Sequence, residues 1–125
     1  MQQAFLWSAA IASAITFVVH TFIGGRVVAR PLLADRSLPK AAKWLAYYCW
    51  HITTVLLSAM AAAYGWAAWS GEARDLTIAI TGLAALLGAL SVGVTLKAGI
   101  NPLRFPSTSL FALTACLGTA GLFSG

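Results

Sequence analysis

The sequence predicts an all-α integral membrane protein with four transmembrane helices. Three observations indicate this fold class: 60% of the 125 residues are hydrophobic, only 9% are charged, and the apolar residues gather in four long runs. Soluble domains usually carry about a quarter charged residues. A helix needs about 20 apolar residues to cross roughly 30 Å of hydrocarbon, so four spans use nearly the whole chain. This composition excludes a disordered chain, a collagen-like fibre and an ordinary soluble enzyme.

The four predicted spans form a single domain, 1–125. They cover about residues 4–25, 44–68, 76–97 and 106–123. Lys97, at the end of the third run, is the only charged residue inside these limits. Lipid offers no hydrogen-bond partners to the backbone, so runs of this length and apolarity are expected to be helices rather than open strands.

Glycine and proline mark the expected connections between the spans. Gly24–Gly25 and Pro31 indicate the end of the first helix, Ser70–Gly71 a tight turn, and Pro106 the entrance to the last helix. The remaining sizeable segment is a basic loop at 26–43. Its apolar residues allow two interpretations, a short amphipathic piece lying in the membrane interface or a solvated loop.

Cations are distributed unevenly among the connections. Seven of the eight Lys and Arg residues fall in the first and third connections, and only Arg74 falls in the second, beside Glu72 and Asp75. Because positively charged loops stay in the cytoplasm, the first and third connections are expected there. Both termini are then expected on the outer, periplasmic side, with the four helices running up, down, up and down.

Small and hydroxyl-bearing residues recur at steps of three and four along the predicted helices, which keeps them on one helical face. Helices in lipid associate where small residues let backbones approach and where hydroxyls bond across. We therefore expect a helix-packing seam that holds a compact antiparallel bundle together. The seam residues are Ser13, Thr16, Thr54, Ser58, Thr81, Gly88, Ser91 and Gly118.

His20 and His51 are the candidate cofactor-binding residues, because ionisable groups inside a membrane are costly and often functional. One interpretation is that both imidazoles are neutral and hydrogen-bonded within the bundle. Another is that both ligate haem iron or another metal, although no carboxylate lies near to orient either ring. A third is a site for a quinone, lipid or other amphipathic ligand, with Tyr47, Trp50 and Arg26 around it.

Four residues near the expected cytoplasmic ends are candidates for contact with lipid headgroups: Arg26, Arg30, Asn101 and Arg104. Guanidinium and amide groups can clamp a phosphate. The segment from Asn101 to Pro106 has an equally simple interpretation as a loop that begins a helix.

Motifs for catalysis and for nucleotide binding are missing from the sequence. It contains no Gly-x-Ser-x-Gly, no His-Glu-x-x-His and no Gly-Lys-Ser/Thr phosphate loop. Aromatic residues do not interleave with the basic ones, so nucleic acid is not an expected partner. Cys49 and Cys116 have no metal-ligand spacing and are expected to be buried thiols. We expect a protein that is not an enzyme.

The layout resembles that of many small four-span bacterial membrane proteins, which implies the bacterial inner (cytoplasmic) membrane. The first functional hypothesis is an accessory or structural subunit, with membrane lipids and other transmembrane helices as its partners. The second is a cofactor-binding protein that uses His20 and His51 for haem-based electron transfer or metal handling. The third is a small lipid or solute carrier acting as a homo-oligomer.

Overall fold

A computed structural model describes residues 1–124, and over these residues it contains helices and no strand. Four helical segments are long and apolar enough to cross a membrane: Gln2–Ala34, Lys40–Ser70, Arg74–Lys97 and Pro106–Phe123. The prediction of an all-α chain with four such helices is confirmed.

The first of these segments is one continuous helix with three parts. The α-helix α1 (Gln2–Val18) passes into a π-helix, η1 (Val19–Ala29), and then into α2 (Arg30–Ala34). The helix therefore does not end at Gly24–Gly25, and residues 26–34 are helical where a loop at 26–43 was expected. Hydrogen bonds to more distant carbonyls, of the i→i+5 type, carry the backbone through the two glycines.

The connection to the next helix is short. α3 (Lys40–Ser70) begins directly after Pro39, so only residues 35–39 separate the first two long helices. The Nζ of Lys43 donates a hydrogen bond to the carbonyl oxygen of Leu33 at 3.2 Å. A lysine in this position donates to a carbonyl that has no partner within α2. Its positive charge also interacts favourably with the negative, C-terminal end of the helix dipole.

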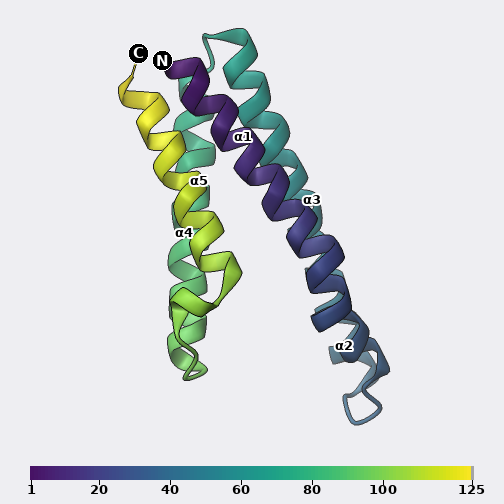
Figure 1. Cartoon of the computed structure of the whole chain (residues 1–125). Helices are drawn as coiled ribbons and strands as arrows, with labels where there is room; N and C mark the ends of the chain where they lie inside the picture. The colour runs from purple at the N-terminus through teal and green to yellow at the C-terminus, as the bar shows by residue number, and fades with distance from the viewer. Residues whose placement is uncertain (125) are drawn as a thin grey trace.

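The remaining elements are α4 (Arg74–Lys97), a 3-10 turn η2 (Pro102–Arg104) and α5 (Pro106–Phe123). Gly71 ends α3 with a φ of 72°, a left-handed conformation that favours glycine and lets the chain turn sharply into α4. Both termini lie at the end of the molecule that carries this turn, and the other two connections lie at the opposite end (Figure 1).

The core lies in the half of the molecule nearest the termini. Leu6, Ala9 and Ala10 of α1 pack there against buried residues of α3 and against Ile80 of α4. The hydroxyl groups of Tyr64 and Thr81 are hydrogen-bonded at 3.0 Å, both buried. Gly118 of α5 lies directly against these two hydroxyls, with no room for a side chain. Three helices therefore meet at one tightly packed junction.

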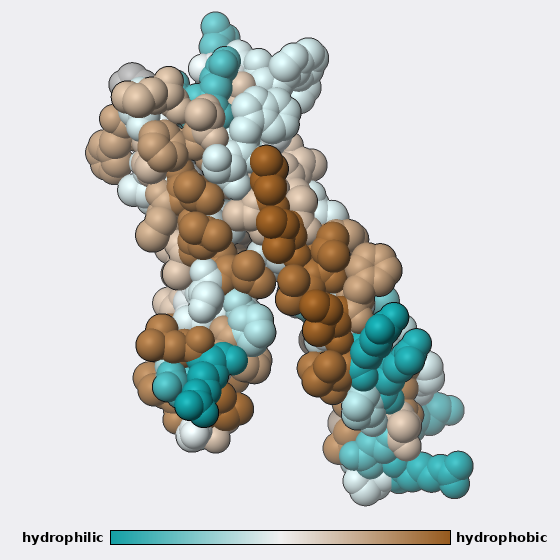
Figure 2. Space-filling view, in the orientation of Figure 1, coloured by the Kyte–Doolittle hydropathy of each residue, from teal (hydrophilic) through white to brown (hydrophobic). Residues whose placement is uncertain are grey.

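Away from this junction the helices separate into two pairs (Figure 1). α1 packs along α3 and also along α5, and α5 packs along α4, whereas α3 and α4 touch much less. η1 and α2 pack on α3. In the space-filling view a gap opens between the two pairs, with hydrophobic residues along its margins and hydrophilic residues at both tips (Figure 2). The arrangement is more open than the compact bundle expected from the sequence.

The structure buries most of the predicted seam. Ser13, Thr16, Thr81, Ser91 and Gly118 are buried, and Thr54 and Gly88 are half-buried. The Ser91 hydroxyl joins α4 to α5 through hydrogen bonds with Ser107 at 2.9 Å and Thr108 at 2.7 Å.

Ser58 lies outside the seam of this chain, because it is exposed and its hydroxyl donates to the carbonyl oxygen of Val55 in its own helix. The buried residues of α3 are Leu57, Met60, Tyr64, Ala67 and Ala68 instead. Ser58 is rotated by about 100° from Leu57 around the helix axis and so lies off this face.

We predict that Gly118→Ala lowers the free energy of unfolding by about 1–3 kcal/mol, because the new methyl group would overlap the hydroxyls of Thr81 and Tyr64. Gly93→Ala in α4 is the matched control. Nothing lies within 4 Å of the position its Cβ would take. Alanine favours a helix over glycine, so this control is expected to be neutral or slightly stabilising. The free energies of unfolding of both variants are measured in mixed micelles that contain an increasing fraction of dodecyl sulfate. Equal effects of the two substitutions would contradict the packing at Gly118.

Candidate functional site

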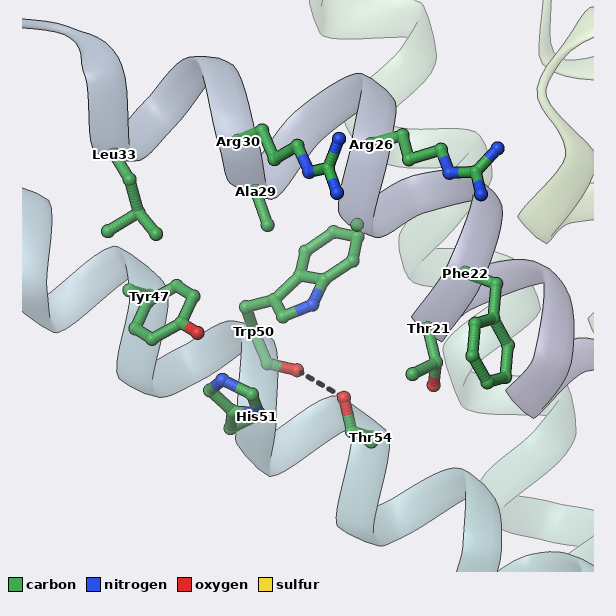
Figure 3. A pocket seen from close by; sticks show the side chains of 11 residues that line it. Thr21, Phe22, Arg26, Ala29, Arg30, Leu33, Tyr47, Trp50, His51 and Thr54 are labelled. Carbon is green, nitrogen blue, oxygen red and sulfur yellow. Dashed lines mark hydrogen bonds between the residues drawn. The ribbon is translucent and has the colours of Figure 1, made fainter.

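A pocket of about 320 Å³ lies between the η1–α2 segment and the first half of α3. The α2 end of these elements lies at the tip of the molecule formed by the 35–39 connection (Figure 1). Figure 3 shows its lining from close by. One wall is formed by Thr21, Phe22, Gly25, Arg26, Ala29, Arg30 and Leu33, and the other by Tyr47, Trp50, His51 and Thr54.

Trp50 occupies the centre of this site because Gly24 gives it room. A Cβ at Gly24 would lie 2.6 Å from the Cη2 atom of the Trp50 ring, whereas nothing lies within 4 Å of a Cβ at Gly25. Gly24 belongs to the π-helical segment, and π-helical turns are rare in proteins and frequent at functional sites. The indole therefore packs against bare backbone and joins the two walls of the pocket.

His20 is held by Trp50 in two ways. The two rings stack with their centroids 3.9 Å apart and their planes 18° from parallel. The Nε2 atom of His20 lies 3.2 Å from the carbonyl oxygen of Trp50. A carbonyl oxygen only accepts hydrogen bonds, so Nε2 carries the hydrogen in this contact and donates it. That nitrogen is therefore not available as a metal ligand.

His51 lies on the pocket wall and is exposed. Its ring meets the ring of Tyr47 edge to face, with centroids 4.5 Å apart and an interplanar angle of 90°. His20 thus packs against Trp50, not against His51. Over residues 1–124 no group of three or more His, Cys, Asp or Glu side chains is placed to hold a metal ion. Cys49 and Cys116, expected to be buried, are exposed free thiols.

The pocket carries two positive charges and no negative one. Its lining includes Arg26 and Arg30 but no aspartate or glutamate. Asp35, the nearest acidic residue along the chain, accepts hydrogen bonds from the hydroxyl and the backbone N–H of Ser37, both at 2.7 Å. These two bonds lower the pKa of the Asp35 carboxyl below its ordinary value.

The other two acidic residues lie at the far end of the molecule. Glu72 and Asp75 are the only further carboxylate side chains in the sequence, and they flank the turn between α3 and α4. That turn lies with the chain termini, opposite the tip that carries the pocket (Figure 1). The positive charge of the pocket therefore has no carboxylate among the residues that line it.

Thr21 adds an unsatisfied polar group to the same lining. Its Oγ1 atom is buried and has no hydrogen-bond partner, whereas the Oγ1 of Thr54 donates to the carbonyl oxygen of Trp50 at 3.2 Å. A buried hydroxyl without a partner costs about 1–3 kcal/mol relative to a paired one.

The four candidate headgroup residues do not form one site. Arg26 and Arg30 line the pocket, whereas Asn101 and Arg104 belong to the 98–105 connection at the tip of the other helix pair (Figure 1). Oδ1 of Asn101 accepts a hydrogen bond from the backbone N–H of Leu103 at 2.9 Å. Asn101 therefore caps the short turn η2. This role matches the interpretation of the segment from Asn101 to Pro106 as a loop that begins a helix.

Comparison with known proteins identifies no relative, since no family model, no curated protein and no solved structure matches the chain. The function must therefore be inferred from the residues and their geometry.

Sequence reasoning missed Thr21, Phe22, Ala29 and Leu33 as pocket residues. A signal for them does exist in the sequence. Two sets of residues spaced four apart line the first wall, and these are 21, 25, 29, 33 and 22, 26, 30. The spacing places each set on one helical face, but the pattern becomes visible only if the helix continues past Gly24–Gly25.

We predict that Gly24→Ala lowers the free energy of unfolding by about 1–3 kcal/mol and displaces the Trp50 ring, because a Cβ there overlaps the indole. Gly25→Ala is the matched control, with open space at its Cβ. Emission from Trp50, recorded in a background where the other four tryptophans are phenylalanine, reports the displacement. Unchanged emission in Gly24→Ala would show that the ring does not depend on this glycine.

Proposed function

We propose that this protein is a four-span accessory subunit of the bacterial inner membrane, which packs against the transmembrane helices of another protein. In this proposal the helices run antiparallel, the 35–39 and 98–105 connections face the cytoplasm, and both termini face the periplasm. The lengths and apolarity of the four helical segments support membrane insertion. The positions of the basic residues support the orientation.

The exposed face of α3 is the observation that carries the accessory role. Midway along this helix, Ser58, Ala59 and Ala62 are all exposed. Ser58 and Ala62 are four residues apart, which is the spacing at which small residues let a second helix approach closely. Val55 on α3 and Ile11, Ile15 and Val18 on α1 are exposed as well, and such large apolar side chains suit contact with lipid. A small-residue surface left uncovered by this chain's own helices suits contact with a helix of another protein.

The orientation predicts opposite accessibility for two exposed serines, Ser37 in the 35–39 connection and Ser70 at the end of α3. In a background with Cys49→Ala and Cys116→Ala, an impermeant maleimide added to intact cells should label Ser70→Cys. Ser37→Cys should be labelled only after the inner membrane is opened. Labelling of both cysteines from one side would overturn the four-span topology.

The accessory role predicts a specific neighbour at α3. A photo-crosslinking amino acid placed at position 58 should give one discrete adduct with another polypeptide in cells. The same amino acid at Ile15, which is 50% exposed on α1, is the matched control and should give no protein adduct. The absence of an adduct at position 58, with the purified protein a lone monomer in mild detergent, would refute the accessory role.

A further inference from the structure

The pocket between η1, α2 and α3 combines features that a phosphate group satisfies. Arg26 and Arg30 are among its lining residues and no carboxylate is, and guanidinium groups form strong, geometrically specific hydrogen bonds to phosphate oxygens. Thr21 contributes a buried hydroxyl that lacks a partner. The volume of about 320 Å³ lies at the low end of the roughly 300–1,000 Å³ typical of small-ligand pockets. It suits a headgroup rather than a whole lipid.

The length of the first helix places this pocket at the level of lipid headgroups. This step rests on the proposed membrane insertion. About 20 residues cross the hydrocarbon, so a span that begins near Ala4 reaches the opposite interface near Ile23. Arg26 and Arg30 follow within the next two turns. Tyr47 and Trp50 are aromatic residues of the kind enriched at membrane interfaces, and they line the opposite wall, with Trp50 near the arginines and Tyr47 opposite Leu33 (Figure 3).

Apolar residues at the pocket favour a lipid over a soluble phosphate compound. Phe22 lines the pocket and is 62% exposed, and Ala29 and Leu33 complete the apolar part of the same wall. An acyl chain that runs from a bound headgroup into the bilayer would cover such a side chain. A free phosphate ester would leave it uncovered. Basic pockets between helices on the cytoplasmic side are known to bind anionic headgroups.

We propose that this pocket binds the phosphate headgroup of an anionic phospholipid. The guanidinium groups of Arg26 and Arg30 bind the phosphate oxygens, and the Thr21 hydroxyl donates one further hydrogen bond. Trp50 holds η1 against α3 so that the two arginines and the threonine border the same cavity. His51 and Tyr47 form the opposite wall beside the headgroup. The acyl chains leave the pocket past Phe22.

Lipid retention by the full-length protein tests this proposal. The protein is reconstituted in vesicles of equal parts phosphatidylglycerol and phosphatidylcholine and extracted in mild detergent, and its bound lipids are measured by native mass spectrometry. The wild-type protein should retain phosphatidylglycerol in preference. Arg26→Gln with Arg30→Gln should reduce this preference at least roughly tenfold, because each arginine provides hydrogen bonds to a charged group. Thr21→Val should reduce it a few-fold.

The matched control is Arg36→Gln with Lys40→Gln, which removes the same charge from residues that do not line the pocket. It should keep the wild-type preference. An equal loss in the control would overturn the proposal, since the effect would then be diffuse surface charge. Retention of phosphatidylglycerol by both the arginine and the threonine variants would overturn it as well. So would displacement of the bound lipid by soluble glycerol phosphate at a concentration similar to that of the lipid.

Circular dichroism and flotation with the vesicles accompany each measurement and separate the possible failures. Wild-type protein that does not float with the vesicles would overturn membrane insertion and, with it, this proposal. Wild-type protein that floats but shows no preference for phosphatidylglycerol would overturn the headgroup site alone. If the arginine variant loses its helical signal, Thr21→Val decides, because valine keeps the shape of threonine and removes only the hydroxyl.

Discussion

Close approach of helices through small residues and paired hydroxyls is the constraint on which this structure depends, and the contact among Tyr64, Thr81 and Gly118 shows it most clearly. In the bilayer that we propose as its environment, helices gain nothing by hiding apolar side chains from equally apolar lipid. They associate through close backbone approach and through hydroxyls that find partners. The Tyr64–Thr81 hydrogen bond satisfies two buried hydroxyls, and Gly118 leaves the space in which they meet. α3, α4 and α5 are joined here, and α1 is held beside them by its packing on α3 and on α5, where Gly121 lies against Leu6.

Because this junction lies close to the chain termini, the other end of the molecule is free to open. There α4 and α5 remain joined by the hydroxyl contacts of Ser91, while η1 and α2 pack on α3. The pocket belongs to the second pair alone and depends on the packing of Trp50 against Gly24. The structure thus separates the residues that hold the four helices together from the residues that can bind a ligand.

Much of this fold could be predicted from the sequence, because an uninterrupted α-helix keeps residues at steps of three and four on one face. The stripe through Thr81 and Ser91 is buried as expected for this reason. The same rule misplaced Ser58, because α3 carries small residues on more than one face, and its buried face is the one with Leu57, Met60, Tyr64 and Ala68. Only part of the pocket could be predicted from the sequence. Arg26 and Arg30 could be named from the sequence, but their separation from Asn101 and Arg104 depends on how far the two pairs diverge.

The π-helical segment has a consequence for how the two halves of the first helix relate. Each residue of an α-helix turns the chain by about 100°, and a stretch bonded at i→i+5 accommodates extra residues without ending the helix. Val19–Ala29 therefore sets the angular phase between the Ser13–Thr16 face and the face that carries Arg26 and Arg30. Wound as an ordinary α-helix, the same residues would turn further around the axis, and the two arginines would leave their present direction relative to the Ser13–Thr16 face. Removing a residue at the same time would largely offset this rotation.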